Sequence, residues 1–418
     1  MLDSLYATSL SIKERIYGNR IVLFAPLYIS NWCVNTCTYC AFRGANKHIQ
    51  RSILTKEELI QEVQALEEMG HRRLLLLTGE SPKYTFDDFL EAVHTVASVK
   101  TDPCGNIRRM NVEIPPLSVS DLRRLKATNE IGTYTVFQET YHPDVYRKYH
   151  PKGGPKSNYE NRLQVMDRAQ IAGIDDVGIG ALFGLYDYKF EVLAMLQHAH
   201  HLDQLYNAGP HTISIPRIRP ADDAPDAMHV PFPVDDDNFA KLVAVLRCAV
   251  PYTGMILSTR ESPEMRQRLL QLGISQMSAG SKTNVGSYSH HDQGQAHPEE
   301  NQSSGQQFSL LDERSLDDIV YQLMKDGYVP SFCTACYRKG RTGAEFMAIA
   351  KKGNIHNFCH PNSLLTLQEY LIDYASPKSK TLGDLVIMNE RETIGGSSTR
   401  AFDKKLKKIQ MGEHDLYF

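Results

Sequence analysis

Apolar and polar residues recur along most of the chain in a repeated strand-then-helix order. Residues 21–30 form an apolar run that predicts a buried strand, and residues 59–69 carry apolar positions at helical spacing. Thr55 and Glu58 precede the second stretch with the spacing of a capping box, and Gly70 follows it where a helix would end. These residues therefore predict one strand followed by one helix.

The same alternation continues to about residue 279. Several of the expected strands are apolar almost throughout, as strands buried on both faces are. Eight such strands close a (βα)8 TIM barrel of about 250 residues, although periodicity alone does not exclude an open doubly wound sheet. The further strands are expected at 72–77, 109–114, 133–138, 176–182, 211–218, 254–259 and 274–279, and the helices at 85–99, 118–126, 157–172, 190–206, 235–249 and 262–271.

Residues 286–308 differ in composition from the rest of the chain. They are rich in Ser, His, Gln, Gly, Asn and Glu and contain almost nothing to bury, so we expect a polar surface loop. Its histidines at 290, 291 and 297 are expected to be solvated rather than metal-bound. The predicted organisation is an N-terminal segment at 1–20, the barrel at 21–285, this loop, and a C-terminal domain at 309–418 that opens with a helix at 315–325.

Composition and charge narrow the class of protein. The 418 residues are 42% hydrophobic and 23% charged, and no apolar run reaches the ~20 residues of a membrane span. The first 20 residues lack the apolar core of a signal peptide. A net charge of -3 without a basic tract argues against nucleic acid as the main partner, so a small substrate is expected.

The cysteines carry the most specific chemistry in the sequence. Cys33, Cys37 and Cys40 form CxxxCxxC directly after the first strand. Three thiolates at this spacing can hold a 4Fe-4S cluster whose fourth iron stays open to a small molecule. A zinc site would need a fourth ligand nearby, and His48 is the only candidate. An iron–sulfur cluster is therefore expected, in a reducing compartment.

A second group, Cys333, Cys336 and Cys359, again provides three ligands in the pattern CxxC-x22-C. The alternative is a zinc site completed by His356 or His360. The presence of the first group favours a second cluster.

Polar residues gather at the expected carboxyl ends of the strands, where barrel enzymes place their sites. Carboxylates and arginines that meet at one rim are typical of an amino-acid site, because carboxylates bind an ammonium group and arginines bind a carboxylate. The set includes the Thr-Gly-Glu run ending at Glu80, Glu113, the Gln-Glu-Thr run at 138–140, Arg217, Arg219, Arg260 and Ser278.

The first cysteine motif, with Tyr39 before its last cysteine, resembles that of the radical S-adenosylmethionine (SAM) superfamily. The runs ETY at 139–141 and STRES at 258–262 resemble its aromatic amino-acid lyase branch, which includes the tyrosine lyase of thiamine synthesis. The motif CxxC-x22-C is similar to that of the FeFe-hydrogenase maturases in this branch. These usually have a longer region before the first cysteine.

This resemblance implies a barrel of the radical SAM type with a mainly helical, cluster-binding C-terminal domain. The first cluster would reduce SAM to a 5′-deoxyadenosyl radical, which attacks L-tyrosine. Cleavage of the Cα–Cβ bond would release p-cresol and dehydroglycine, and the latter would be converted to CO and cyanide at a second 4Fe-4S cluster that carries a labile iron. Free cysteine, reductant proteins and other hydrogenase maturases would be the partners, in the cytoplasm or in a hydrogenosome or plastid.

The same resemblance implies roles for individual residues. Glu80, at the position of the superfamily's GGE motif, would take the SAM ammonium, and Arg260 and Ser278 would hold tyrosine. Arg217 and Arg219 are alternatives for either carboxylate. His211 opens the sixth strand at the opposite face of the barrel, where it would ligate the labile iron or simply form hydrogen bonds at a strand start. Tyr39, Glu139, Gly178 and Gly180 are expected on the cofactor side, with tight packing as the alternative for the glycines.

Two other functions remain open at this point. A thiamine-pathway tyrosine lyase would stop at dehydroglycine and need only the first cluster, so the second cysteine group argues against it. A non-catalytic iron–sulfur scaffold would not need the polar residues at the strand ends.

Overall fold

A closed barrel forms the centre of the molecule. The computed structural model describes residues 2–289, 305–395 and 397–418. In this part of the chain β1 pairs with both β2 and β8, which closes the sheet and confirms the barrel over the open alternative. Its eight parallel strands are β1 (Arg20–Ser30), β2 (Arg73–Thr78), β3 (Arg109–Glu113), β4 (Ile131–Thr135), β5 (Asp176–Gly180), β6 (Thr212–Ser214), β7 (Gly254–Leu257) and β8 (Gln276–Ser278).

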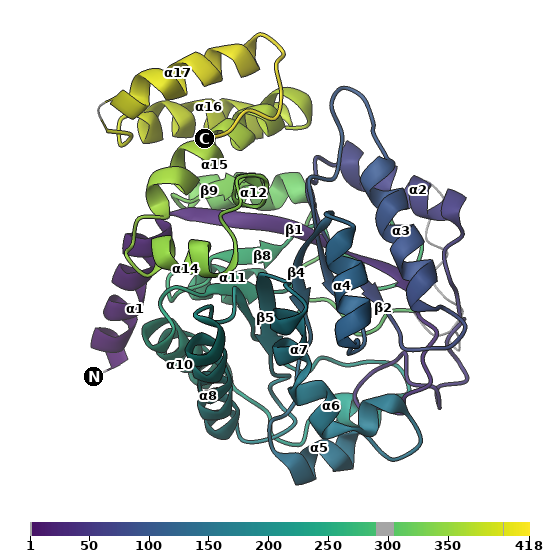
Figure 1. Ribbon diagram of the computed structural model, residues 1–418. Helices are drawn as coiled ribbons and strands as arrows, with labels where there is room; N and C mark the ends of the chain where they lie inside the picture. The colour runs from purple at the N-terminus through teal and green to yellow at the C-terminus, as the bar shows by residue number, and fades with distance from the viewer. Residues whose placement is uncertain (1, 290–304, 396) are drawn as a thin grey trace.

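Helices surround the strands (Figure 1). The capping box at Thr55 is confirmed, with the Thr55 and Glu58 side chains bonded to each other's backbone. The N-terminal helix packs against the barrel, where Lys13 Nζ donates to the Leu270 carbonyl at 3.0 Å. The helices are α1 (Leu2–Tyr17), α2 (Lys56–Glu68), α3 (Phe86–Ser98), α4 (Val119–Ala127), α5 (Pro143–Tyr149), α6 (Tyr159–Leu163), α7 (Val165–Ile171), α8 (Tyr188–Tyr206), α9 (Pro225–Met228), α10 (Asp236–Ala249) and α11 (Pro263–Leu270).

The fourth strand–helix unit differs most from the expectation. The helix expected at 157–172 is broken at Gln164 into α6 and α7, after a 3-10 turn at Pro155–Ser157. Helix α5, which begins with a proline at its first turn, was not predicted. Strand β4 begins earlier and ends earlier than the expected 133–138.

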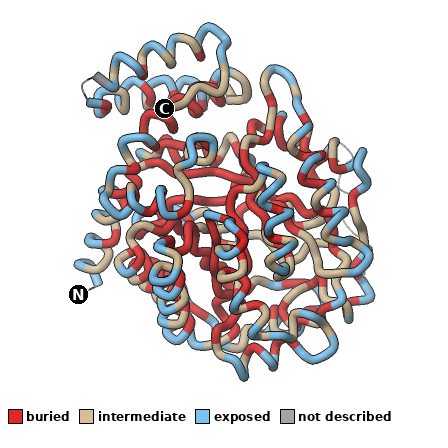
Figure 2. Tube along the Cα trace, in the orientation of Figure 1, coloured by how far each residue is buried: buried red, intermediate tan, exposed pale blue. Residues whose placement is uncertain are grey.

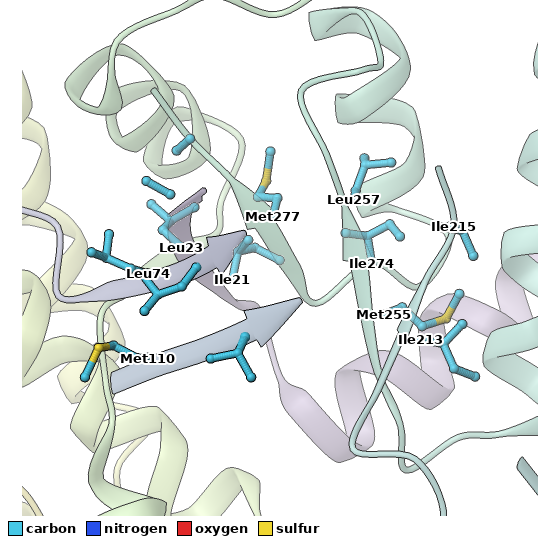
Figure 3. Close-up of a cluster of buried hydrophobic side chains, with 14 of the residues drawn as sticks. Ile21, Leu23, Leu74, Met110, Ile213, Ile215, Met255, Leu257, Ile274 and Met277 are labelled. Carbon is cyan, nitrogen blue, oxygen red and sulfur yellow. The ribbon is translucent and has the colours of Figure 1, made fainter. Parts of the chain in front are cut away.

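Side chains of the barrel strands alternate between two environments, as the strand period of two requires. In β1, Leu23 and Leu27 belong to the core between sheet and helices, whereas Phe24 and Tyr28 line the barrel cavity. The same alternation holds in the neighbouring strands, and Figure 3 shows Leu74, Met110, Met255 and Met277 among the core side chains. Both faces are covered, which accounts for the near-continuous apolar strands in the sequence.

The C-terminal region adds a ninth strand and a helical layer. Strand β9 (Val329–Ser331) pairs in parallel with the start of β1, Arg20 opposite Val329, and was not predicted. In Figure 1, α15 to α17 stack beyond β9 at the top of the molecule, and Figure 2 shows a continuous buried stretch in α15. The helices are α12 (Leu316–Lys325), α13 (Ala335–Arg338), α14 (Gly343–Ala350), α15 (His356–Asp373), α16 (Pro377–Arg391) and α17 (Ser397–Gln410).

The expectation that residues 286–308 have almost nothing to bury is wrong at both ends. Tyr288 is 2% exposed, and its hydroxyl donates to the Pro26 carbonyl at 2.7 Å. Gln307 and Phe308 line the barrel cavity. The intervening residues, with His290, His291 and His297, lie outside the described residues. No helix in the described ranges has the length and apolar character that crossing a bilayer requires.

Candidate active site

The cysteine loop follows β1 and is organised by one arginine. Arg51 donates to the carbonyl oxygens of Asn31, Phe42 and Arg43 at 2.6, 2.7 and 2.6 Å, and more weakly to that of Asn46 at 3.1 Å. Loop carbonyls that no strand or helix satisfies are thereby paired. The loop therefore has a defined shape at the carboxyl end of β1.

Cys33, Cys37 and Cys40 line one cavity, and all three are free thiols. Burial raises the pKa of Cys37, and burial together with the other two thiols raises that of Cys40 to about 12. Thiols in such a place ionise when a cation binds them, so this donor set fits an iron–sulfur cluster. Among the described residues, no group of three or more His, Cys, Asp or Glu side chains is arranged to hold a single metal ion.

Glu80 lies beside this loop. Asn35 Nδ2 donates to Glu80 Oε2 at 2.6 Å and lies 3.7 Å from Cys33 Sγ. Gly79, just before Glu80, lies so close to the Trp32 carbonyl oxygen that a β-carbon would collide with it. The end of β2 and the cysteine loop are therefore in direct contact.

Glu139 faces the same cavity and is held by two cations. Its backbone φ is 69°, and its Oε1 lies 2.6 Å from Lys156 Nζ and 3.4 Å from Arg162 Nη2. Burial opposes its ionisation, but Lys156 and Arg162 outweigh burial and hold the pKa of Glu139 at about 2. Tyr39 also lines the cavity, and its hydroxyl is 2.7 Å from His150 Nε2. Glu139 is thus a fixed negative charge.

The cavity continues into the barrel. We call the part lined by the three cysteines the upper cavity and the part inside the barrel the lower cavity, and Arg260 and Glu113 line both. The Arg260 guanidinium lies 3.3 Å from the centre of the Phe308 ring, and burial lowers its pKa. Within the described ranges this guanidinium has no hydrogen bond or ion pair. Burial, and then the charge of Glu139, raises the pKa of Glu113 to about 7. Ser278 lines the lower part.

Other predicted residues lie outside the cavity lining. Arg217 and Arg219 both bind Glu261, with Arg217 Nε 3.0 Å from Oε1 and Arg219 Nη2 2.6 Å from Oε2. At Gly178 a β-carbon would lie 2.5 Å from Thr135 Oγ1, and Gly180 is similarly confined by Phe137. The two arginines are therefore engaged with a carboxylate, and the two glycines allow neighbouring strands to pack.

The second cysteine group lies at the other end of β1. Cys333 follows β9, which pairs with the first residues of β1, and its carbonyl accepts from Arg73 at 2.9 Å. A hydrogen bond from Cys336 lowers the pKa of Cys359 to about 7 against the effect of burial, and Arg20 adds to this. The three thiols lie within electrostatic reach of one another and of Arg20. This donor set also fits an iron–sulfur cluster.

Three histidines were candidate metal ligands in the sequence: His211 for the labile iron, and His356 or His360 for a zinc site. His211 is buried, with Nδ1 3.3 Å from Asp176 Oδ1 and its ring 4.7 Å from that of Phe346 in α14. It therefore lies where the C-terminal domain meets the barrel. His360 Nε2 is 2.9 Å from Thr393 Oγ1, and His356 stacks on His360.

Several residues at the site were not predicted. Lys156 and Arg162 lie 17 and 23 positions after their partner Glu139, Lys156 just before and Arg162 within the helix that was expected at 157–172. Gln307 and Phe308 were assigned to a surface loop. Asn35 and Arg51 flank or belong to the cysteine motif, and their proximity in sequence is the one pattern that could have identified them.

Comparison with known proteins agrees with this geometry. Residues 27–199 match the radical SAM superfamily, and residues 214–329 match the biotin and thiamin synthesis associated domain. The 2-iminoacetate synthase of Escherichia coli is 32% identical over 331 residues, which cover 79% of this chain and 82% of that protein.

Two solved structures of HydG, a maturase of the FeFe-hydrogenase, are also similar. One is 49% identical with a TM-score of 0.93, covering 100% of this chain and 88% of that one. HydG from Carboxydothermus hydrogenoformans is 41% identical with a TM-score of 0.82, covering 98% and 86%. The chain therefore belongs to the radical SAM superfamily, in the group that contains the HydG maturases and the 2-iminoacetate synthases.

Proposed function

We propose that this protein cleaves the Cα–Cβ bond of L-tyrosine to p-cresol and dehydroglycine, and converts the latter to CO and cyanide for the FeFe-hydrogenase H-cluster. One observation carries this proposal. A single barrel has at one end a three-cysteine group and a cavity in which half-buried Arg260 stacks on Phe308 and has no hydrogen bond or ion pair within the described ranges, and at the other end a second three-cysteine group. The similarity to HydG supports the same assignment.

At the cysteine end of the cavity, Cys33, Cys37 and Cys40 would hold a 4Fe-4S cluster, which would supply the electron for reductive cleavage of SAM. Glu80 receives the SAM ammonium, and Asn35, bonded to it at 2.6 Å, fixes the carboxylate. Glu139 stays ionised through Lys156 and Arg162, which provides a second fixed negative charge for the cofactor.

In the lower cavity, Arg260 binds the tyrosine carboxylate and Ser278 adds a hydroxyl. The apolar rings of Phe24 and Phe137 contribute to the same wall and suit the aromatic side chain. Enclosure by the barrel keeps a reactive radical away from water.

At the far end, Cys333, Cys336 and Cys359 would hold the second cluster. Asp176 Oδ1 lies 3.3 Å from His211 Nδ1, so Nε2 would be the nitrogen of His211 that is available to the labile iron. Free cysteine would be a further ligand of that iron. A reductant protein supplies electrons, other maturases receive the product, and the compartment is the reducing cytoplasm or an organelle equivalent.

Product analysis tests this proposal. The anaerobically reconstituted protein, given SAM, reductant and tyrosine, should form p-cresol, deoxyadenosine, CO and cyanide. C336A/C359A and H211A should keep p-cresol formation and lose CO. Unchanged CO release from H211A would count against the labile-iron role, and absence of both p-cresol and deoxyadenosine from the wild type would favour the scaffold function.

The thiamine-pathway lyase is the second candidate, because the E. coli 2-iminoacetate synthase is similar over most of the chain. It predicts p-cresol and dehydroglycine without CO or cyanide from the wild-type protein. Iron and sulfide counting would then give one cluster per chain rather than two.

A further inference from the structure

Two side-chain amides lie against the thiols of the cysteine loop, and one of them comes from a distant segment. Asn35 Nδ2 is 3.7 Å from Cys33 Sγ, and Gln307 Nε2 is 3.7 Å from Cys40 Sγ. Asn35 belongs to the loop and is also bonded to Glu80. Gln307 lies 267 positions after Cys40 in the chain. The fold therefore brings a second amide donor to the cysteines from outside their motif.

The orientation of the Gln307 amide is set by a hydrogen bond. The hydroxyl of Tyr28, which is 4% exposed, donates to Gln307 Oε1 at 2.8 Å. With its oxygen engaged there, the amide presents Nε2 to the Cys40 sulfur. Tyr28 belongs to β1, so this anchor is part of the barrel wall.

The backbone of Gln307 is fixed as well. Its N–H donates to the Thr283 carbonyl at 2.9 Å, and its carbonyl accepts from the Ala41 N–H at 3.3 Å. The Phe308 carbonyl next to it accepts from Thr283 Oγ1 at 3.0 Å. Gln307 is therefore held by hydrogen bonds of its backbone as well as by the bond of its side chain to Tyr28.

We propose that Gln307 is a positioning residue that raises the reduction potential of the cluster on the cysteine loop, through an N–H···S hydrogen bond to Cys40 oriented by Tyr28. Hydrogen bonds to cluster sulfurs are one of the means by which proteins set these potentials. The bond offsets part of the negative charge on the sulfur, and the reduced cluster carries more of that charge. This inference rests on the first cluster of the proposed function but not on tyrosine cleavage.

The test is a redox titration followed by EPR on the reconstituted protein without SAM. Q307M removes the N–H donor at similar volume, and the potential should become more negative. Q307E should lower it further, because a carboxylate places negative charge beside the sulfur. Y28F should lower it less than Q307M, since the amide remains but loses its anchor.

Controls separate this role from a structural one. Q322M makes the same chemical change in α12, where Gln322 bonds Asp326, and should leave the potential unchanged. A wild-type ENDOR coupling from an exchangeable proton should disappear in Q307M. If Q307M incorporates less iron than the wild type, the reduction potential of Y28F is used instead to test the proposal.

An unchanged reduction potential in Q307M with full iron content would overturn the inference. If Q307M contains less iron than the wild type, an unchanged potential in Y28F would do the same. The wild type could still form p-cresol in that case. Conversely, a wild type that forms no p-cresol would contradict the proposed function and leave the titration valid.

Discussion

Two neighbouring carboxylates in the cavity show how local charge decides protonation. Glu139 is buried and Glu113 is half-buried, but Lys156 and Arg162 contact Glu139 directly and keep its pKa at about 2. Glu113 has no such contact among the described residues, and its pKa rises to about 7. One carboxylate is thus a permanent charge, and the other can exchange a proton near neutral pH.

The raised pKa of Glu113 predicts a specific pH dependence of stability. Between its ordinary value of 4.5 and about 7, the folded chain binds more protons than the unfolded chain. The free energy of unfolding should therefore fall as pH rises through this window, by up to about 3 kcal/mol. In E113Q this contribution should vanish. Denaturant unfolding under reducing conditions, at pH values on either side of the window, measures the free energy of unfolding of both proteins. The same change of this free energy with pH in the wild type and in E113Q would contradict the assignment.

At the scale of single residues, the sequence was informative where functional residues lie at a recognisable spacing in the chain. It was uninformative where a residue's role depends on a contact with a residue far away in the chain. Cys33, Cys37 and Cys40 could be grouped in advance because they lie close in sequence, and the structure places all three at one cavity. Lys156 carries no such pattern, since its partner Glu139 is reached only through the turn that precedes α6. Arg217 and Arg219 looked available for a ligand because Glu261, which binds both, is more than 40 positions away.

At the scale of elements, the cysteine loop depends on Arg51. R51A should lose several charge-assisted hydrogen bonds to loop carbonyls, at a cost of about 2–4 kcal/mol in local stability. We expect a lower iron and sulfide content at the first cluster, seen by EPR, with the barrel retained. R51K, which keeps the charge but not the planar fork, should be intermediate. Full cluster content in R51A would show that the cysteines hold their positions without this arginine.

Gly79 tests the contact between the end of β2 and the same loop. In G79A the new β-carbon would collide with the Trp32 carbonyl, so the backbone before Cys33 must shift, at a cost of about 1–3 kcal/mol. The expected result is reduced iron content and a lower thermal midpoint. G395A is the matched control, because a β-carbon there meets nothing within 4 Å. Similar behaviour of the two variants would argue against this contact.

The elements themselves were predictable where local and tertiary preferences agree. The helix after Thr55 was correct because its cap, apolar stripe and terminal glycine all lie within one short stretch. Strand β9 was missed because three residues give no periodicity, and its pairing with Arg20 of β1 spans most of the chain. Helix α7 separates from α6 at Gln164, although the helical pattern of the sequence continues through this residue.

At the scale of the whole molecule, a buried ion pair joins the barrel to the C-terminal layer. Arg108 Nη1 lies 2.8 Å from Glu369 Oε2 in α15, and these side chains are 3% and 4% exposed. R108M should leave the Glu369 carboxylate without its cation, although the Asp415 N–H still donates to Glu369 Oε1 at 2.6 Å, and should destabilise the protein by about 3–5 kcal/mol. Faster hydrogen exchange in α15 and a lower denaturant midpoint would show this.

The double variant R108M/E369Q separates charge from packing. It removes the unpaired charge and should recover part of the lost stability. If it is as unstable as R108M alone, loss of packing rather than of the ion pair explains the effect.

Strand β1 has a consequence for how this protein can evolve. It pairs with β8 and β9 at its start and with β2 at its end, and the two cysteine groups lie at its opposite ends. Its 11 residues, at about 3.3 Å each, fix the separation of those ends. One inserted or deleted residue would disrupt the register with three neighbours at once and turn cavity side chains toward the helices. Length changes should therefore be excluded from β1 across descendants of this gene, while substitutions that keep the alternation are tolerated.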